Sequence, residues 1–336
     1  MIGRLSGNAG LGFFHRTGLS LLLALWFSQP VLATVATPSG DLLGSITYQV
    51  TDDKTVLVEV AQKNDLGILA ISAANPGVDI WVPGAERLIV LPTAHILPEV
   101  DRRGIVINLA ELRLYLFRGD VVETHAIGVG REGYGTPVGT TQVVRKTKDP
   151  TWRPTADTRA DRPDLPAVVP PGPDNPLGRH AIYLGWPTYL IHGTNKPFGV
   201  GRRVSRGCIR MYPEAVADLF GKVGPNTRVQ VINEPVKLGW SGGELFIEAH
   251  PDIDQLDELE ATYSFSLKPP PDIRQRIIAK AGDAAARIDW DVVEAELMER
   301  RGIPAQITRG NTRVAIDDGG ERPTTAAVPG AFTGLY

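Results

Sequence analysis

The sequence contains little of what disulfides, metal sites and nucleic-acid-binding proteins need. Its 336 residues include one cysteine, Cys208, which cannot close a disulfide within the chain or build a thiolate metal cluster. None of the six histidines stands in a zinc-binding spacing such as His-Glu-x-x-His, so the sequence predicts no metal site. The net charge is −3, which gives no positive field to attract nucleic acid.

Hydrophobic runs of membrane-spanning length are also missing. The apolar run near the N-terminus, Leu19–Phe27, has nine residues, whereas a helix that crosses a bilayer needs about 20. Basic residues precede this run and the small-residue sequence Val31-Leu32-Ala33 follows it, which is the pattern of an export signal. We expect a signal peptide over residues 1–33, cleaved after Ala33 or after Ala36, rather than an uncleaved anchor. The mature protein is then exported and keeps no stable membrane span.

The export signal makes the lone cysteine more informative. In an oxidising compartment an unpaired thiol is open to oxidation, so it persists where it is buried or where it has a function. Cys208 is therefore either a small apolar core residue or a reactive thiol.

The residues after the export signal predict a small domain of the order strand, helix, helix, strand over residues 44–93. Strands are expected over Ile46–Val50 and Glu86–Pro92, and helices over Thr55–Lys63, with Thr55 as N-cap, and from Gly67 onwards. This order resembles the LysM domain, a peptidoglycan-binding module. The pieces that carry the resemblance are Tyr48–Val50, Ala73–Val78 and the stretch from Pro83-Gly84 to Leu91-Pro92. Glycan binding and a spacer role without a ligand both remain open.

Short strands dominate the next part of the chain, residues 102–234, so we expect a mainly β domain there. Turns rich in glycine separate the strands. The predicted strands are Gly104–Asn108, Arg113–Arg118, Val121–Val129, Thr141–Thr147, Ala181–Leu184, Tyr189–His192 and Thr227–Ile232. One helix is expected over Pro213–Val223, and the proline-rich residues Asp149–Gly178 are expected to form a long loop.

A C-terminal extension is expected over residues 235–301. Glu244–Ala249 and Ala261–Leu267 have strand-like patterns, and Asp272–Glu299 has a helical pattern that is interrupted near Gly282. Residues 302–336 lack periodicity, and we expect a disordered tail there.

A histidine and the cysteine stand in an arrangement suited to nucleophilic catalysis. His192 ends a predicted strand, and Cys208 follows sixteen residues later, just before the predicted helix. A thiolate is the reactive form of cysteine, and a neighbouring imidazole can take the thiol proton and return it to a leaving amine. Gly207 lets the backbone come close, and the amides of Gly207 and Cys208 could face a developing oxyanion.

Two arginines flank the cysteine. Arg206 and Arg210 add positive charge, which is expected to lower the pKa of the thiol. Their guanidinium groups are also suited to holding a substrate carboxylate by paired hydrogen bonds. From the spacing alone, catalysis and an inert buried cysteine both remain open.

This segment resembles the signature of the L,D-transpeptidase (YkuD-type) family, which are cysteine enzymes of the bacterial cell wall. The signature is His-Gly-Thr followed by Ser-(often His)-Gly-Cys-(Ile or Val)-Arg. It is matched here by His192-Gly193-Thr194 and by Ser205-Arg206-Gly207-Cys208-Ile209-Arg210. Two upstream pieces, Thr136–Thr140 and Asn175–Leu184, are also similar to the family, and the resemblance covers residues 103–233.

The resemblance implies roles for the residues of the site. Cys208 would be the nucleophile and His192 the base, and thiol and imidazole supply the chemistry without a metal or cofactor. The expected catalytic group is Cys208, His192, Gly207, Ser205 and Gly193, and the candidate substrate contacts are Arg210, Arg206, Thr194 and Tyr183. Arg206 stands where many members have histidine, and a structural charge and a substrate ligand are equally expected of it.

The resemblance also implies a β-sandwich-like catalytic domain, a periplasmic location and an acyl transfer on peptidoglycan stem peptides. The nucleophile would attack the bond between a diamino acid and the terminal D-Ala of a tetrapeptide stem. An amine of a second stem would then give a cross-link, and a lysine of an outer-membrane lipoprotein would give a wall anchor. A hydrolase with the same nucleophile and a non-catalytic wall-binding protein are the alternatives. The resemblance further implies sensitivity to carbapenems.

Overall fold

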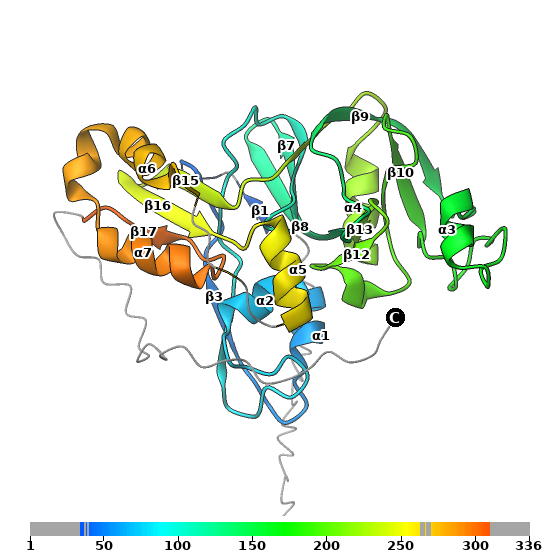
Figure 1. Cartoon of the computed structure of the whole chain (residues 1–336), viewed down its shortest axis with the longest axis horizontal. Coiled ribbons are helices and arrows are strands. Elements are labelled where there is room, and N and C mark those ends of the chain that lie inside the picture. Colours follow the sequence, from blue (N-terminus) through cyan, green and yellow to red (C-terminus); the bar gives the residue numbers. More distant parts are fainter. Residues whose placement is uncertain (1–33, 37, 39, 263–265, 267–269, 310–336) are drawn as a thin grey trace, which may run out of the picture. The chain divides into compact units, whose positions relative to one another are not determined.

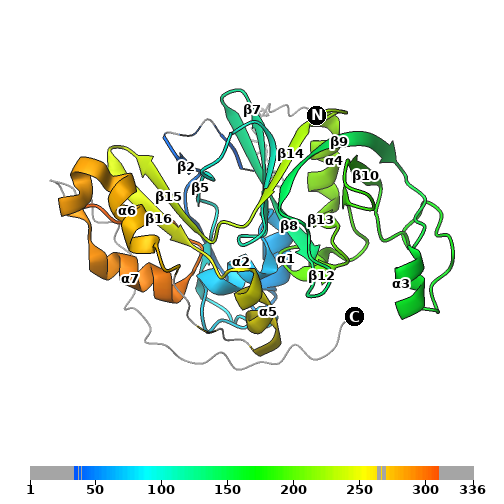
Figure 2. The ribbon, with the colours of Figure 1, turned by 45° about the horizontal axis from the view of Figure 1, so that its top comes forward.

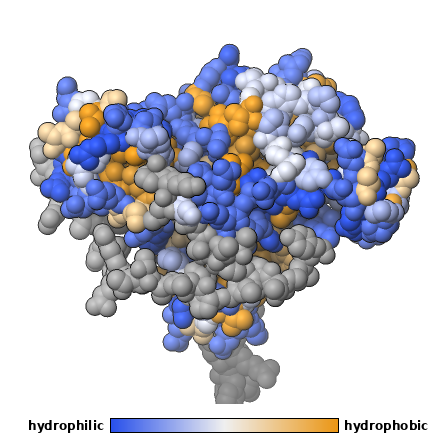
Figure 3. Space-filling model, in the orientation of Figure 1, coloured by the Kyte–Doolittle hydropathy of each residue, from blue (hydrophilic) through white to orange (hydrophobic). Residues whose placement is uncertain are grey.

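The computed structural model describes residues 34–36, 38, 40–262, 266 and 270–309 (Figure 1). The signal peptide expected over residues 1–33 and residues 310–336 of the expected tail lie outside the described residues. Within the described part of the chain, no helix is long and apolar enough to cross a membrane. Hydrophilic residues cover most of the described surface on the face that Figure 3 shows, and hydrophobic residues gather there in separate patches.

The strand–helix–helix–strand order expected for residues 44–93 is present. It consists of β3 (Thr47–Val50), α1 (Leu57–Lys63), α2 (Ile68–Ala74) and β4 (Leu88–Leu91). The two strands pair in antiparallel register. As expected, Gly67 precedes α2, and Asn75 ends it. The Asn75 amide donates to the carbonyls of Ile71 and Val90, which fastens α2 to β4.

The N-cap expected for α1 is wrong. The helix begins at Leu57, with Val56 as N-cap residue and no side chain capping it. The Thr55 hydroxyl donates instead to the carboxylate of Asp52, because the short polar side chains of the preceding turn satisfy each other.

The middle of the chain forms a mixed sheet in which most strands are antiparallel. Its strands are β1 (Thr34–Ala36), β6 (Gly104–Asn108), β7 (Arg113–Arg118), β8 (Val121–Gly130), β9 (Gly139–Lys148), β10 (His180–Leu184), β11 (Leu190–His192), β12 (Arg203–Ser205), β13 (Ile209–Met211) and β14 (Arg228–Ile232). The order is β1-β8-β13-β11-β10-β9-β14-β6-β7, and β8 also pairs with β7 and with β12. The expected mainly β class is confirmed.

Two long strands give this sheet its sandwich-like form. β8 pairs with β7 over Val121–Ala126 and with β13 at Ile127 and Gly128. β9 pairs with β14 over Gly139–Gln142 and with β10 over Val143–Lys148. Each long strand therefore runs from one layer into the other, and buried apolar side chains of both layers form a single core.

Helices and loops complete this part of the chain. α4 (Pro213–Lys222) follows β13, and its residues Ala215, Val216 and Leu219 are buried in the core. Pro213 stands at the start of the helix, where its missing N–H has no partner to lose. The expected loop over Asp149–Gly178 contains a short helix, α3 (Ala156–Asp161), which the sequence pattern did not indicate.

The C-terminal extension forms a second, smaller sheet with helices. The sheet has the order β15 (Val236–Ser241), β16 (Glu244–Ala249) and β17 (Ala305–Gln306). The helices are α5 (Ile253–Thr262), α6 (Ile273–Ala281), the 3-10 helix η2 (Gly282–Arg287) and α7 (Trp290–Glu299). The helical pattern of residues 272–299 is thus interrupted at Gly282 as expected, where φ is +53°.

Two boundaries of this extension differ from the expectation. The strand expected over Ala261–Leu267 is wrong at its start, because Ala261 and Thr262 end α5; residues 263–265 and 267–269 lie outside the described residues. The disordered tail expected from residue 302 is wrong for its first residues, 302–309. Ala305 and Gln306 pair with β16 as β17, and Ile307 is fully buried, so the chain returns to the small sheet before residue 310.

A buried charge network joins the small sheet to the large one. Lys237 of β15 is fully buried, and its Nζ lies 2.6 Å from Oε2 of Glu111 and 3.0 Å from Oε2 of Glu248. Lys237 also donates to the hydroxyl of Tyr115 in β7 at 3.1 Å. Two short strands, β2 (Leu42–Leu43) and β5 (His95–Ile96), lie at the same junction.

Candidate active site

Parallel pairing of β11 and β13 brings the expected base and nucleophile to one place. His192, the last residue of β11, pairs with Arg210 of β13, and Cys208 lies two residues before Arg210. The charge of Arg210 acts on both His192 and Cys208, so the three groups form one electrostatic unit.

His192 is held in a defined tautomer. Its side chain is buried, and Nδ1–H donates to the carbonyl of the next residue, Gly193, at 2.6 Å. This hydrogen bond leaves the lone pair on Nε2. Burial and then the Arg210 guanidinium lower the pKa of His192 to about 4, so the imidazole is neutral near pH 7 and can accept a proton.

Cys208 is partly buried, and its environment keeps the thiol protonated. The S–H group donates to the carbonyl of Thr188 at 3.4 Å. Burial raises the pKa of the thiol, and a backbone hydrogen bond together with Arg210 opposes this only in part. The expected net lowering of the thiol pKa is therefore wrong, because desolvation of the thiolate outweighs the nearby positive charge.

A hydrogen-bonded turn presents the cysteine. The Ser205 hydroxyl accepts the N–H of Gly207 at 3.1 Å and donates to the carbonyl of Cys208 at 2.6 Å. Gly207 has φ +100°, and a Cβ there would lie 2.7 Å from the ring of Tyr189, so only glycine fits. The N–H of Gly207 is thus already bonded, and the expectation that it faces an oxyanion is wrong; of the expected pair, the amide of Cys208 is the remaining donor.

Thr136 is also hydrogen-bonded to the turn that holds Cys208, here called the nucleophile turn. Its hydroxyl donates to the carbonyl of Gly207 at 2.9 Å and accepts the N–H of Gly130 at 3.2 Å. The residue belongs to the Thr136–Thr140 piece that the sequence singled out, and its side chain is buried. Thr136 therefore connects the end of β8 to the nucleophile turn.

Arg210 is a cation without a carboxylate partner among the described residues. Its guanidinium is largely desolvated, which lowers its pKa, and its buried Nε has no hydrogen-bond acceptor in the described part of the chain. A partly buried cation without a counter-charge favours an anionic group of a ligand.

Arg206 has structural partners instead. It forms an ion pair with Asp161 at the end of α3, and its Cζ lies 4.3 Å from the ring centre of Tyr134. Tyr134 also donates to Asp161 at 2.7 Å. These contacts join the long loop to the nucleophile turn and favour the structural one of the two roles that the sequence left open.

Two of the expected substrate contacts, Thr194 and Tyr183, already have partners within the chain. The Thr194 hydroxyl is buried and accepts the N–H of Lys196 at 2.9 Å, which shapes the chain after β11. The Tyr183 ring is covered by the Arg145 guanidinium at 3.3 Å. Their roles as substrate contacts stay predictions.

Two residues next to Cys208 had no clear sequence signal. Tyr189 lies against Gly207 and packs edge-on against Trp186, with ring centres 6.1 Å apart. Thr188 has φ +71°, which is uncommon for a β-branched residue, and its carbonyl accepts the thiol. Their position just before β11 was the one available hint.

Two groups of acidic residues and histidines lie close enough to hold a metal ion. They are His95, Glu111 and Glu248, and Glu123, His125 and Asp218. In each group a lysine ammonium already contacts both carboxylates, Lys237 in the first and Lys222 in the second. In each group the lysine ammonium thus stands where a metal cation would bind. The expectation of no metal site stays a prediction.

Comparison with known proteins connects this geometry to a family. Residues 102–231 match the family model of the YkuD L,D-transpeptidase catalytic domain. The probable L,D-transpeptidase ErfK/SrfK of Escherichia coli (strain K12) is 38% identical over 305 residues, which are 88% of this chain and 96% of that protein. The probable L,D-transpeptidase YcfS of the same organism is 38% identical over 287 residues, which are 81% of this chain and 87% of that protein. Among solved structures, the catalytic domain from E. faecium L,D-transpeptidase covers 40% of this chain and 100% of that chain, at 23% identity and a TM-score of 0.33.

Proposed function

This chain belongs to the L,D-transpeptidase family of peptidoglycan-modifying enzymes, and on that premise we propose that Cys208 is its nucleophile and His192 its general base. The observation that carries the proposal is the state of His192. Its Nδ1–H is bonded to the Gly193 carbonyl and its pKa is low, so a neutral imidazole offers Nε2 as a proton acceptor.

The first half of the reaction forms a thioester. Cys208 Sγ attacks the carbonyl between the diamino acid and the terminal D-Ala of a tetrapeptide stem, while the thiol proton passes to Nε2 of His192. Because the thiol pKa is raised, the proton leaves during the attack rather than before it. His192 then gives this proton to the amine of the departing D-Ala as the carbon–nitrogen bond breaks.

The second half transfers the acyl group to an amine. The acceptor amine attacks the thioester carbonyl and gives a proton to His192, and the departing sulfur takes a proton back to regenerate the thiol. An amine of a second stem gives a cross-link, and the terminal lysine of an outer-membrane lipoprotein gives a wall anchor. Water as acceptor gives the hydrolase, which is the second candidate activity.

Substrate binding is assigned to the cation beside the thiol. Arg210 is desolvated and has no carboxylate partner in the described part of the chain, so we assign it a carboxylate of the stem peptide. Ser205, Gly207 and Gly193 act on the backbone around the two reacting groups.

We also propose that the mature enzyme works in the periplasm after cleavage of the export signal. Cleavage after Ala33 keeps β1, which pairs with Val122–Thr124 of β8, whereas cleavage after Ala36 removes it.

Residues 44–93 are assigned to peptidoglycan binding as a LysM-like domain, with the spacer role as the alternative.

The first test is the intact mass of the mature chain with and without meropenem, beside Cys208→Ala. The expected result is a covalent adduct on the wild type and none on the variant. An absent adduct with a thiol that iodoacetamide still alkylates would contradict the proposed site geometry. An absent adduct with a thiol that resists alkylation would favour the wall-binding alternative.

Products then separate the acceptors. The enzyme is incubated with tetrapeptide muropeptides, alone and with a peptide that ends in lysine, and products are identified by mass. Cross-linked dimers or lysine adducts with release of D-Ala are the expected products. Tripeptide alone would assign the hydrolase activity instead.

A further inference from the structure

The loop that joins His192 to Cys208 has few backbone bonds of its own. It contains one 3-10 turn, η1 (Pro197–Gly199), and the three-residue strand β12. β12 pairs with β8 in parallel, with a register shift between Arg203 and Ser205. Backbone bonds to β8 and α2 hold parts of this loop, and side-chain contacts from other parts of the chain add to them.

Arg203 of β12 makes the most extensive of these contacts. Its side chain is 6% exposed, and Nε donates to the carbonyl of Gly130 at 3.0 Å. One terminal nitrogen donates to the carbonyl of Ile253 at 2.6 Å and forms an ion pair with Asp257. A single guanidinium thus connects the end of β8 to α5 of the C-terminal extension.

Gly130 continues this path to the nucleophile. Its N–H is bonded to Thr136, whose hydroxyl holds the carbonyl of Gly207, the residue before Cys208. The two glycine backbones also touch, since a Cβ on Gly130 would lie 3.0 Å from Cα of Gly207. A displacement of Arg203 would therefore reach the nucleophile turn within two contacts.

A second ion pair also connects β8 to α5, about one helical turn after Asp257. Arg202, the neighbour of Arg203, bonds through Nε to Oε1 of Glu260 at 2.7 Å. Residues 257 and 260 lie three apart on α5 and so share one face of the helix. The carbonyl of Arg202 accepts the N–H of Val129, so this pair also ends on β8.

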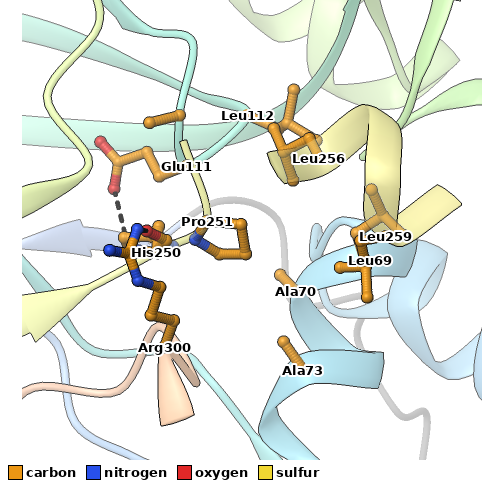
Figure 4. Close-up of a pocket in the computed structure, with 11 residues that line it drawn as sticks. Leu69, Ala70, Ala73, Glu111, Leu112, His250, Pro251, Leu256, Leu259 and Arg300 are labelled. Carbon is orange, nitrogen blue, oxygen red and sulfur yellow. Dashed lines mark hydrogen bonds and ion pairs between the residues drawn. The ribbon is translucent and has the colours of Figure 1, made fainter. Parts of the chain in front are cut away.

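The apolar side of α5 anchors the helix. Leu256 belongs to the main core, and Leu256 and Leu259 line a small pocket opposite Leu69 and Ala73 of α2 (Figure 4). Both ribbon views show α5 beside α2 (Figures 1 and 2). The helix is thus held by apolar contacts while its acidic face reaches the two arginines.

We propose that Asp257 of the C-terminal extension is a positioning residue for the active site, which acts through Arg203 on the nucleophile turn, with Glu260 and Arg202 in the same role. This inference rests on the proposed function of Cys208. Without Asp257, the buried guanidinium would lose its counter-charge and move toward water, and Gly130 and Gly207 would follow. The extension is then part of the catalytic unit, although residues 102–231 alone match the family model.

The test compares Asp257→Asn with Asp254→Asn in the full mature chain. Asp254 is on the same helix and exposed, with no ion pair among the described residues, so it is a matched control. The readouts are kcat and KM for D-Ala release, the rate of Cys208 acylation by meropenem, and Tm. We expect Asp257→Asn to lower kcat and the acylation rate about 10- to 100-fold, the scale of a small misplacement of reacting groups. KM should stay near the wild type, whereas Tm should fall, because Arg203 loses its counter-charge. All readouts of Asp254→Asn should stay near the wild type.

Two further variants keep the result decisive if Asp257→Asn fails to fold. Asp257→Glu keeps the charge and should restore most of the rate. Glu260→Gln removes the partner of Arg202, which is more exposed than Arg203, and should lower kcat in the same direction by less. Wild-type rates in both Asp257→Asn and Glu260→Gln, or equal losses in Asp257→Glu and Asp257→Asn, would overturn the inference. A wild type without any adduct on Cys208 would instead overturn the proposed function, and this inference with it.

Discussion

The proposed nucleophile, Cys208, and the proposed base, His192, rest in their neutral forms, and the charge of Arg210 acts on both. Burial raises the pKa of the Cys208 thiol, and burial with Arg210 lowers the pKa of His192 to about 4. Arg210 stabilises a thiolate and opposes an imidazolium. The proposed reaction therefore needs a coupled proton transfer, for which a neutral imidazole is available at any pH well above the pKa of His192.

The fall in the rate of Cys208 acylation at low pH, which is the acid limb of the pH–rate profile, reports the protonation of His192. In the wild type, acylation of Cys208 should slow as the pH falls through about 4, because the imidazole becomes protonated and cannot accept the thiol proton. Arg210→Gln removes the charge that opposes the imidazolium, so the pKa of His192 rises and the limb moves to higher pH. The measurement is the rate of the meropenem adduct by intact mass across pH.

Arg206→Gln is the matched control for this shift. The Arg206 charge is paired with Asp161, and it is not among the groups that shift the pKa of His192 or of Cys208. Its limb should coincide with that of the wild type. A limb that stays in place in Arg210→Gln, or that moves equally in both variants, would contradict the electrostatic role of Arg210.

The start of α2 also holds the active-site loop, through backbone contacts. The N–H groups of Ile68 and Leu69 donate to the carbonyls of Val200 and Gly201 at 3.5 and 3.4 Å. The first turn of α2, whose N–H groups have no partner within the helix, is thus bonded to the active-site loop. A Cβ on Gly201 would lie 2.2 Å from Cα of Gly67, so the two backbones touch.

Replacing Gly201 by alanine should separate α2 from this loop. Gly77→Ala is a close control, because both glycines have φ +77° but nothing lies within 4 Å of a Cβ on Gly77. Gly77→Ala should lose about 1–2 kcal/mol from left-handed backbone strain alone. Gly201→Ala should lose more and should also slow acylation of Cys208. Urea unfolding and the adduct rate measure both, and equal losses would argue against the contact.

Across the whole molecule, buried charges connect parts that are far apart in sequence. Lys237 lies between Glu111 and Glu248, and all three side chains are at most 1% exposed. The pKa of Lys237 is raised, because the two carboxylates outweigh the burial that opposes its charge. The junction of the two sheets therefore contains a buried ammonium that contacts two carboxylates.

Lys237→Met should destabilise the chain strongly. Removal of the ammonium leaves two carboxylates buried without a cation, and such a loss costs about 3–5 kcal/mol. Lys280→Met is the control, since Lys280 forms an ion pair with Glu99, a side chain that is 60% exposed. Its loss should cost about 0–1 kcal/mol. Urea unfolding of both variants checks the difference, and similar losses would contradict the structural role of the network.

Local sequence patterns predicted short strands in which apolar residues dominate. The bounds expected for Gly104–Asn108, Arg113–Arg118 and Glu244–Ala249 agree with the structure, in which most residues of these strands are buried. α5 was missed. Four of its ten residues are acidic, and its apolar residues contact α2 and the core, so its helical state depends on distant partners.

The sequence by itself determined which groups can react. Cys208, His192 and Arg210 stand in a short local pattern, and the chemistry of thiol, imidazole and guanidinium depends on residue type. Only the tertiary structure decided the state of these groups. The raised thiol pKa, the bonded N–H of Gly207 and the contact of Arg203 with Asp257 depend on burial and on neighbours that are near in space but not in sequence.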